Sequence, residues 1–271
     1  KPWHMYGNIL LNIVAYVSLA LGLYYGTVQD YLYILLCYTI IGINEQAFFH
    51  RMYTHKSWDC PKWVKFFGLW ISNLSLLGPV ILWVALHRGH HRYNDTEKDP
   101  HSPLYMSNWR IQFLSSTLKF DYRLAADVAK DKLCQMFTQH YYLSLLIAYT
   151  IFAYFFGVDK LFLILFAATG LALLLSNCIN TWHHGPVYWF GQYRNTQILP
   201  DTSKNDLIMG YIMFDGWHNN HHHFPSAARQ GFYWWEIDLT YYGLKILSAL
   251  GLIWDLRKVP AEVLSNKRII K

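Results

Sequence analysis

Charged residues are scarce in this sequence, and that scarcity is the first feature that narrows its class. Of 271 residues, 15% are charged, whereas 54% are hydrophobic and 18% are aromatic. Water-soluble domains carry about 25% charged residues, so this composition argues against one and indicates a membrane protein. The mean hydropathy is only +0.11, so the apolar residues must be concentrated in some segments. We therefore expect a membrane part and a substantial aqueous part.

Two kinds of site motif are also missing. The cysteines Cys37, Cys60, Cys134 and Cys178 show no CxxC spacing, and two of them lie in apolar segments. This spacing indicates neither a disulfide framework nor a cysteine-ligated zinc site, and reduced thiols fit a cytoplasmic face. The sequence contains no Glu-x-x-His motif, which soluble dimetal enzymes place inside a helix bundle. Any metal site in this chain must therefore rely on other ligands.

Long apolar runs are present, and they come in pairs. Residues 8–25 and 31–49 are each close to the length that crosses a hydrocarbon core, and residues 141–156 and 161–179 repeat the arrangement. Short connections, "GTVQD" and "GVDK", make each pair a helical hairpin. Residues 63–86 are long enough to span but are interrupted by polar residues and Gly78-Pro79, so we expect an interfacial or re-entrant segment. The sequence predicts a single all-α membrane domain over 1–271 with four transmembrane helices.

The distribution of positive charge predicts the orientation of this domain. With four spans, both termini and the segments of about 50–140 and 180–271 lie on one side, and all Lys and Arg residues except Lys1 and Lys160 fall in these two segments. By the positive-inside rule that side is cytoplasmic. The first span is not a cleavable signal peptide, because a second apolar run follows it without a small-residue cleavage site. The net charge of +6 needs no nucleic-acid partner, since attraction to anionic lipid headgroups or a solvated basic face accounts for it.

Histidine is abundant, and 13 of its 14 copies lie in the two predicted cytoplasmic segments. Four clusters stand out: "HRMYTH" (His50, His55), "HRGHH" (His87, His90, His91), "NTWHH" (Asn180, His183, His184) and "HNNHH" (His218, His221, His222). The second and fourth clusters have i, i+3, i+4 spacing, which projects imidazoles from one face of a helix. His50 and His55 are five apart and would diverge on a regular helix, so we expect one of them past a helix end.

These clusters predict a metal centre. Neutral imidazole is the commonest transition-metal ligand, and many histidines with almost no cysteine indicate iron, zinc, copper or nickel. About nine ligands are too many for one ion, so the hypothesis is a binuclear centre. The alternative, surface or core histidines gathered by chance, suits any one residue alone but not four clusters at one membrane face.

The three boxes "HRMYTH", "HRGHH" and "HNNHH", with "DPHSP" at 99–103 and "ARQGFYWWEIDLTYYGLKIL" at 228–247, resemble the membrane fatty acid desaturases. The similarity runs from about His50 to Val259 and is greatest to the Δ9 branch of acyl-CoA and acyl-lipid desaturases. It implies four transmembrane helices under a cytosolic helical cap. It also implies an O2-dependent desaturase that inserts a cis double bond, at Δ9, into a saturated fatty acyl chain.

The resemblance further implies a di-iron centre held by nine histidines, with an asparagine that reaches one iron through a water. Box by box these are His50, His55, His87, His90, His91, His184, His218, His221 and His222, with Asn180 as the asparagine. The third cluster departs from the family pattern, because His183 is a rival to His184. We prefer His184, since its i+4 spacing from Asn180 keeps both on one helix face.

The substrate and redox partner are less defined by the sequence. Animal acyl-CoA desaturases carry an Arg-Asp pair before the second box, whereas Ala85 and Leu86 stand here, so CoA, lipid and carrier-protein carriers all stay open. The aromatic residues Trp83, Trp182 and Trp217 near the boxes are candidates for the substrate tunnel, although membrane-interface anchoring explains each of them as well. No haem or iron-sulfur segment is visible, so a separate cytochrome b5 or ferredoxin must supply two electrons. The resemblance places the protein in the endoplasmic reticulum of a eukaryote, or in the inner or thylakoid membrane of a bacterium.

Two other functions compete with desaturation. A fatty acyl or lipid hydroxylase of the same superfamily would share the boxes, but the "WWEIDL" and "DPHSP" segments favour a desaturase. A non-enzymatic metal transporter or haem protein would place histidines or carboxylates inside the spans, where none occur except at the cytoplasmic ends. Of the remaining histidines, we expect His101 in a structural turn, His4 and His140 near the interface, and His223 outside the metal ligands.

Overall fold

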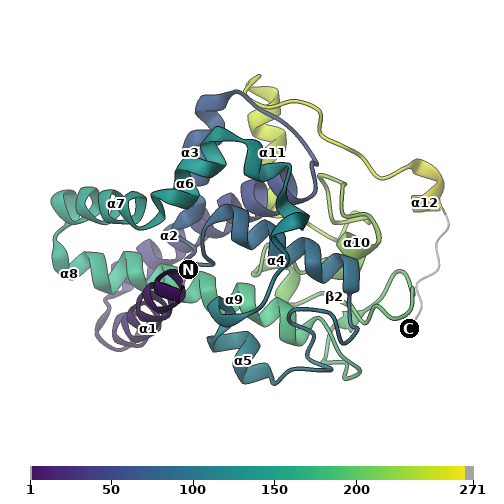
Figure 1. Cartoon of the computed structure of the whole chain (residues 1–271), viewed down its shortest axis with the longest axis horizontal. Coiled ribbons are helices and arrows are strands. Elements are labelled where there is room, and N and C mark those ends of the chain that lie inside the picture. The colour runs from purple at the N-terminus through teal and green to yellow at the C-terminus, as the bar shows by residue number, and fades with distance from the viewer. Residues whose placement is uncertain (1, 266–271) are drawn as a thin grey trace.

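The computed structural model describes residues 2–265 and is mostly helical. Its membrane helices lie together on the left of Figure 1, and the parts that bear the histidines lie to their right. Within the described residues, the only sheet is a two-stranded antiparallel one, formed by β1 (Gln192–Tyr193) and β2 (Asn205–Asp206). The fold is therefore all-α, as the sequence predicts.

Three helical segments are long and apolar enough to cross a membrane: Met5–Tyr25, Val28–Thr54 and Val158–Trp182. They comprise α1 (Pro2–Tyr25), α2 (Val28–Asn44) with the π-helix η1 (Glu45–Thr54), and α8 (Val158–Lys160) with the π-helix η5 (Leu161–Phe166) and α9 (Ala167–Trp182). The fourth predicted span forms the shorter apolar helix α7 (Tyr141–Phe156). The apolar helices thus match the four predicted segments, and three of them meet the length of a span.

Small residues bring the first and last of these segments close together. A Cβ added at Gly170 of α9 would lie 2.4 Å from the carbonyl oxygen of Ala15 in α1, so only glycine permits this approach. Membrane helices commonly pack through such small residues. At the other end, Thr27 and Asp30 form a capping box at the start of α2, and Lys160 Nζ donates to Asp30 Oδ1 at 2.7 Å. The two predicted hairpin connections therefore lie side by side.

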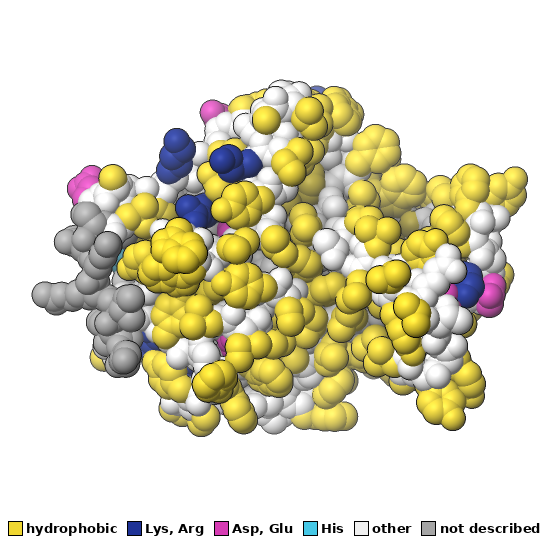
Figure 2. Space-filling view, turned by 180° about the vertical axis from the view of Figure 1, so that it is seen from behind, with side chains coloured by type: hydrophobic (Ala, Val, Ile, Leu, Met, Phe, Trp, Pro, Cys, Tyr) yellow, Lys and Arg dark blue, Asp and Glu magenta, His cyan; other side chains and the backbone are white. Residues whose placement is uncertain are grey.

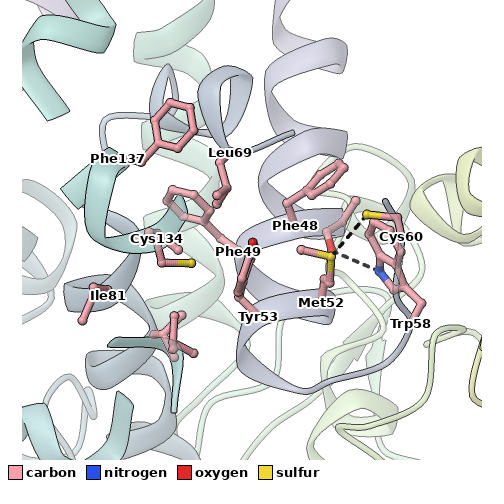
Figure 3. Packing of buried hydrophobic residues seen from close by; sticks show 14 of the residues in the cluster. Phe48, Phe49, Met52, Tyr53, Trp58, Cys60, Leu69, Ile81, Cys134 and Phe137 are labelled. Carbon is pink, nitrogen blue, oxygen red and sulfur yellow. Dashed lines mark hydrogen bonds between the residues drawn. The ribbon is translucent and has the colours of Figure 1, made fainter. Parts of the chain in front are cut away.

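The predicted interfacial segment 63–86 forms two helices instead of one. α3 (Lys62–Asn73) and α4 (Val80–Tyr93) are separated by residues 74–79, where Gly78 has φ +100°. Both helices pack against η1 in one buried cluster. Figure 3 shows Phe48, Phe49, Met52 and Tyr53 of η1 beside Leu69 of α3, Ile81 of α4 and Phe137 of α6 (Lys132–Gln139). This core fixes the first two histidine boxes relative to each other.

The rest of the chain consists of short elements joined by loops. These elements are α5 (Asn108–Phe113), η2 (Ser115–Thr117), η3 (Tyr122–Ala125), η4 (Val128–Lys130), η6 (Met209–Tyr211), α10 (His218–His223), α11 (Leu239–Ala249) and α12 (Ala261–Ser265). Seen from behind, hydrophobic side chains cover most of the part formed by the membrane helices, as a bilayer-embedded surface requires (Figure 2).

Candidate metal centre

Five histidines converge on one point and form what we call the five-histidine group. His50, His55, His87, His91 and His221 each offer a nitrogen within 4.8 Å of the others. His221 Nε2 lies 2.9 Å from His50 Nε2 and 3.0 Å from His91 Nε2, and His91 Nε2 lies 3.1 Å from His87 Nε2. Ring nitrogens from three histidine boxes therefore surround a gap about the size of one atom.

A second set, the four-histidine group, lies beside the first. It consists of His90, His184, His218 and His222, whose nitrogens also lie within 4.8 Å of one another. His184 Nε2 is 3.0 Å from His218 Nε2, and His90 Nε2 is 3.3 Å from His222 Nε2. The rings of His91 and His222, one from each group, stack at 4.4 Å. All nine histidines that the sequence singles out are thus brought together in two adjacent groups.

The spacing of His50 and His55 has a cause that the sequence pattern did not reveal. Residues 45–54 form a π-helix, in which each hydrogen bond closes five residues on, and His55 N donates to His50 O at 3.2 Å. Residues five apart then lie on one face. His55 follows the last residue of η1, as expected, but the wider helix is what brings both imidazoles to the same group.

Each i, i+3, i+4 set is divided between the two groups. In α4, His87 and His91 belong to the five-histidine group and His90 to the four-histidine group. In α10, His221 belongs to the first group, whereas His218 and His222 belong to the second. Two short helices therefore face each other across both groups, and each supplies ligands to both.

The third cluster is arranged differently from the expected helix face. α9 ends at Trp182, so His184 lies past the helix and does not share a helical face with Asn180. His184 nevertheless joins the four-histidine group, whereas His183 is directed to Asp206, with 3.6 Å between His183 Nε2 and Asp206 Oδ2. The geometry therefore favours His184 over its neighbour, because the chain turns after α9 and not because the helix continues.

Carboxylates orient three rings of the four-histidine group by contacting the ring nitrogens that point away from the converging Nε2 atoms. The Nδ1 atoms of His90, His184 and His218 lie 2.9, 2.9 and 3.1 Å from carboxylate oxygens of Asp99, Asp95 and Asp215. A carboxylate accepts hydrogen bonds, so each Nδ1 carries the ring hydrogen and each Nε2 of a neutral ring presents a lone pair. The lone pairs of His184 and His218 then face each other at 3.0 Å. Such a pair is repulsive unless a cation lies between them, and this fits a metal ion.

The charge state of the buried imidazoles also fits metal binding. Burial, with the charges of Arg88 and Arg51, lowers the pKa of His55 to about 3, and burial lowers the pKa values of His87, His91, His218, His221 and His222 well below their usual range. Neutral imidazole is the form that coordinates metal. These six imidazoles are therefore neutral and able to bind cations at neutral pH, whereas the Asp99 carboxylate, acting against burial, raises the pKa of His90.

Asp95 holds the most hydrogen bonds of the orienting carboxylates. Its Oδ2 accepts hydrogen bonds from His184 Nδ1, from Thr202 N at 2.8 Å and from Thr202 Oγ1 at 2.6 Å. Its Oδ1 accepts a hydrogen bond from Ser102 Oγ at 2.8 Å. The sequence gave no signal for Thr202, or for Gln46, whose Oε1 lies 2.6 Å from His50 Nδ1, because these contacts join segments far apart or lie within the π-helix.

We expect Asp95→Asn to lower metal affinity by about 10–100-fold, the usual cost of removing a partner that orients a metal-bound histidine. The amide cannot accept all the bonds that the carboxylate accepts, so the His184 ring loses its fixed orientation. The measurement is iron bound per chain against a competing chelator. Asp121→Asn, which changes an exposed pair with Arg123, is the control and should retain iron. Equal iron binding by Asp95→Asn and wild type would contradict this role.

Two adjoining cavities lead to the histidines. The first, about 60 Å³, is lined by His50, His87, His101 and His218, and Asn180 lies on its wall. The second, about 380 Å³, reaches Met5 and Asn8 at the start of α1 and shares Leu77, Trp83, Leu86, Ser115 and Leu118 with the first. Together they form a path from the surface beside a membrane helix to the histidine groups.

The three tryptophans that the sequence singled out occupy different positions. Trp83 lines both cavities, and its ring stacks on His87 at 4.8 Å with an interplanar angle of 11°. Trp217 is 1% exposed, packs against Gly210 and donates from Nε1 to the Ile237 carbonyl at 3.0 Å. Trp182 is 43% exposed and lies near Trp189. Only Trp83 of the three is a wall residue of these two cavities.

Comparison with known proteins agrees with this site. The sequence pattern of fatty acid desaturases matches residues 29–245. The chain is 33% identical over 250 residues to the Acyl-CoA C20 Delta5-desaturase of Anemone leveillei, covering 86% of this chain and 75% of that protein. It is 33% identical over 236 residues to Delta-9 acyl-lipid desaturase 1 of Arabidopsis thaliana, covering 84% and 75%. With the sn-1 stearoyl-lipid 9-desaturase of Synechocystis sp. it shares 32% over 240 residues, covering 86% and 73%.

Apolar helices joined to buried histidine groups, together with this match over most of the chain, define a membrane-bound oxidoreductase of lipids. The chain belongs to the fatty acid desaturase family. It is a fatty acyl desaturase.

Proposed function

We propose that this desaturase inserts a cis double bond at the Δ9 position of a saturated acyl chain, using O2, two external electrons and two iron ions. The observation that carries the proposal is the pair of buried histidine groups whose Nε2 atoms converge while Asp95, Asp99 and Asp215 hold the opposite nitrogens. Nitrogen-only donor sets with little cysteine suit iron among the transition metals.

In this proposal the two groups are the two metal sites. The five-histidine group holds one iron, and the four-histidine group holds the other, with Asn180 reaching it through a water. Bound iron would supply the activation of O2 that removing hydrogen from an unactivated methylene requires. The chain itself fixes the positions of the imidazoles on η1, α4 and α10 and keeps the site buried, which excludes bulk water from the reaction.

The two cavities serve as the acyl path. Leu77, Leu86 and Leu118 give an apolar lining where the cavities meet, and Trp83 forms the wall next to His87. Stacking on His87 fixes the indole, so an acyl chain passing Trp83 has its reacting carbons held beside the histidine groups. The mouth at Met5 and Asn8 lies at the start of membrane helix α1, so a lipid-borne chain can enter at headgroup level.

The membrane topology completes the proposal. α7 is 16 residues, or about 24 Å at 1.5 Å per residue, and pairs with the α8–α9 segment as the fourth span. Both histidine groups and the cap then lie at the cytoplasmic face, where the basic residues are concentrated. An external cytochrome b5 or ferredoxin delivers electrons there. The acyl carrier is a lipid or CoA, as in the names of the relatives.

The test is fatty acid profiling of a desaturase-deficient host that expresses the wild type or the His221→Ala variant. We expect a new monoenoic acid only with the wild type, with the double bond located by derivatisation and mass spectrometry. Hydroxylated products would assign the chain to the hydroxylases of the same superfamily. The proposal would be refuted if protein shown to contain iron, supplied with a competent electron donor, formed no new product.

A further inference from the structure

The two histidine groups are unequal, and the smaller cavity adjoins both of them. One group brings five imidazoles together and the other four. Catalytic metal sites keep a position open for an exchangeable ligand, and the group with fewer protein ligands is where that position belongs. The first cavity, about 60 Å³, is lined by His218 of the four-histidine group and by His50 and His87 of the five-histidine group, and it has room for a few small molecules.

Several polar side chains outside both groups also line this cavity. They include Asn180 and His101, besides Gln46 and Asp215, which already contact histidines of the two groups. We expected His101 only in a structural turn, and its backbone N does donate to Asp99 Oδ1 at 3.0 Å. Its ring, however, is directed inward. His101 is 3% exposed and its ring lies 4.2 Å from that of His90, a member of the four-histidine group.

The His101 imidazole is a buried polar group that still needs a partner. Its Nδ1 is buried and makes no hydrogen bond among the described residues. A neutral imidazole offers one donor and one acceptor nitrogen. Leaving such a group unsatisfied costs about 1–3 kcal/mol, so buried polar atoms of this kind normally contact a water or ligand.

We propose that His101 is a positioning residue of the metal centre, which together with Asn180 holds the exchangeable ligand of the four-histidine site, whether water or O2. His101 belongs to neither histidine group, although it forms a further possible ligand set with His90 and Asp99. Because His90 Nδ1 and Asp99 are already hydrogen-bonded to each other, we assign His101 to the bound small molecule and not to a metal. The inference rests on the proposed di-iron function.

The test compares His101→Phe, which keeps an aromatic ring beside His90, with His101→Asn, which keeps a hydrogen-bonding group. Azide is the probe, because it is a small anion whose binding to iron-loaded, oxidised protein is followed by visible absorption. We expect His101→Phe to retain iron but bind azide about tenfold more weakly, the loss of one hydrogen bond to a charged ligand. His101→Asn should restore most of the affinity. During turnover, His101→Phe should oxidise more reductant per double bond formed.

His140→Phe is the matched control, since His140 is exposed and lies outside the histidine groups, and it should behave as wild type. Unchanged azide affinity and coupling in His101→Phe would overturn the inference. Loss of iron from His101→Phe would overturn it too, because His101 would then be a ligand. A wild-type protein without bound iron would overturn both this inference and the proposed function. Failure of the inference alone would leave an iron-loaded, active wild type whose His101→Phe variant either behaves as wild type or loses iron.

Discussion

Replacing His221 with alanine should abolish both iron binding at the five-histidine group and desaturation. His221 lies at the centre of that group, with His50 Nε2 at 2.9 Å and His91 Nε2 at 3.0 Å from its own Nε2. Removing a residue that orients a metal-bound histidine costs about 10–100-fold, and removing the ligand itself should cost at least as much. We therefore expect activity to fall by about 100-fold or more, with iron content reduced toward one ion per chain.

The matched control is His223→Ala, two positions along the same short helix. His223 belongs to neither histidine group, so its loss should leave both iron content and product formation near the wild-type values. Iron is measured by mass spectrometry of purified protein and product by fatty acid profiling. Retention of two irons and of activity by His221→Ala would show that these nitrogens do not bind the metals.

The largest effect on stability is expected from Asp238→Asn. Asp238 forms a buried ion pair with Arg51, whose Nη1 donates to Asp238 Oδ2 at 2.7 Å and whose Nη2 donates to Oδ1 at 2.9 Å. Arg51 is fully buried and also donates to the Ala228 carbonyl and to Gln230 Oε1. Removing one charge of such a pair leaves the other uncompensated, which costs about 3–5 kcal/mol.

This loss should appear as a lower free energy of unfolding in denaturant titrations of the micelle-solubilised protein. Asp127→Asn is the comparison, because Asp127 pairs with Lys56 and Arg88 at a site where its side chain is 47% exposed. Its loss should have a much smaller effect, since solvent screens an exposed pair. An Asp238→Asn protein as stable as wild type would show that the pair is not needed to hold the histidine helices.

This ion pair links the first histidine box to the C-terminal part of the chain. Arg51 lies between His50 and His55 in the π-helix, and Asp238 begins α11 by accepting from Tyr241 N at 3.0 Å. The segment "ARQGFYWWEIDL" thus anchors the helix that carries the first box. A change in Asp238 is therefore expected to weaken iron binding as well, through displacement of η1.

Many of the helices could be predicted from the sequence, because the length of an apolar run depends only on neighbouring residues. The apolar runs at 8–25, 31–49, 141–156 and 161–179 all became helices, and the broken run at 63–86 became two. The exact extents were not readable, since α1 and the second segment continue beyond the apolar run into residues held by tertiary contacts. The π-helix at 45–54 left no trace in the residue pattern, because its wider turn is stabilised by packing.

The sequence by itself identified the candidate residues for a metal centre: the histidine boxes, their order and the membrane setting follow from residue type and spacing. Only the tertiary structure decided how those histidines divide into groups of five and four, that His184 rather than His183 faces the others, and that His101 reaches the same cavity. The physical reason is that spacing fixes neighbours along one helix, whereas a metal site is built between helices. The convergence of η1, α4, α10 and the chain after α9 depends on packing between segments more than 100 residues apart, such as His50 with His221.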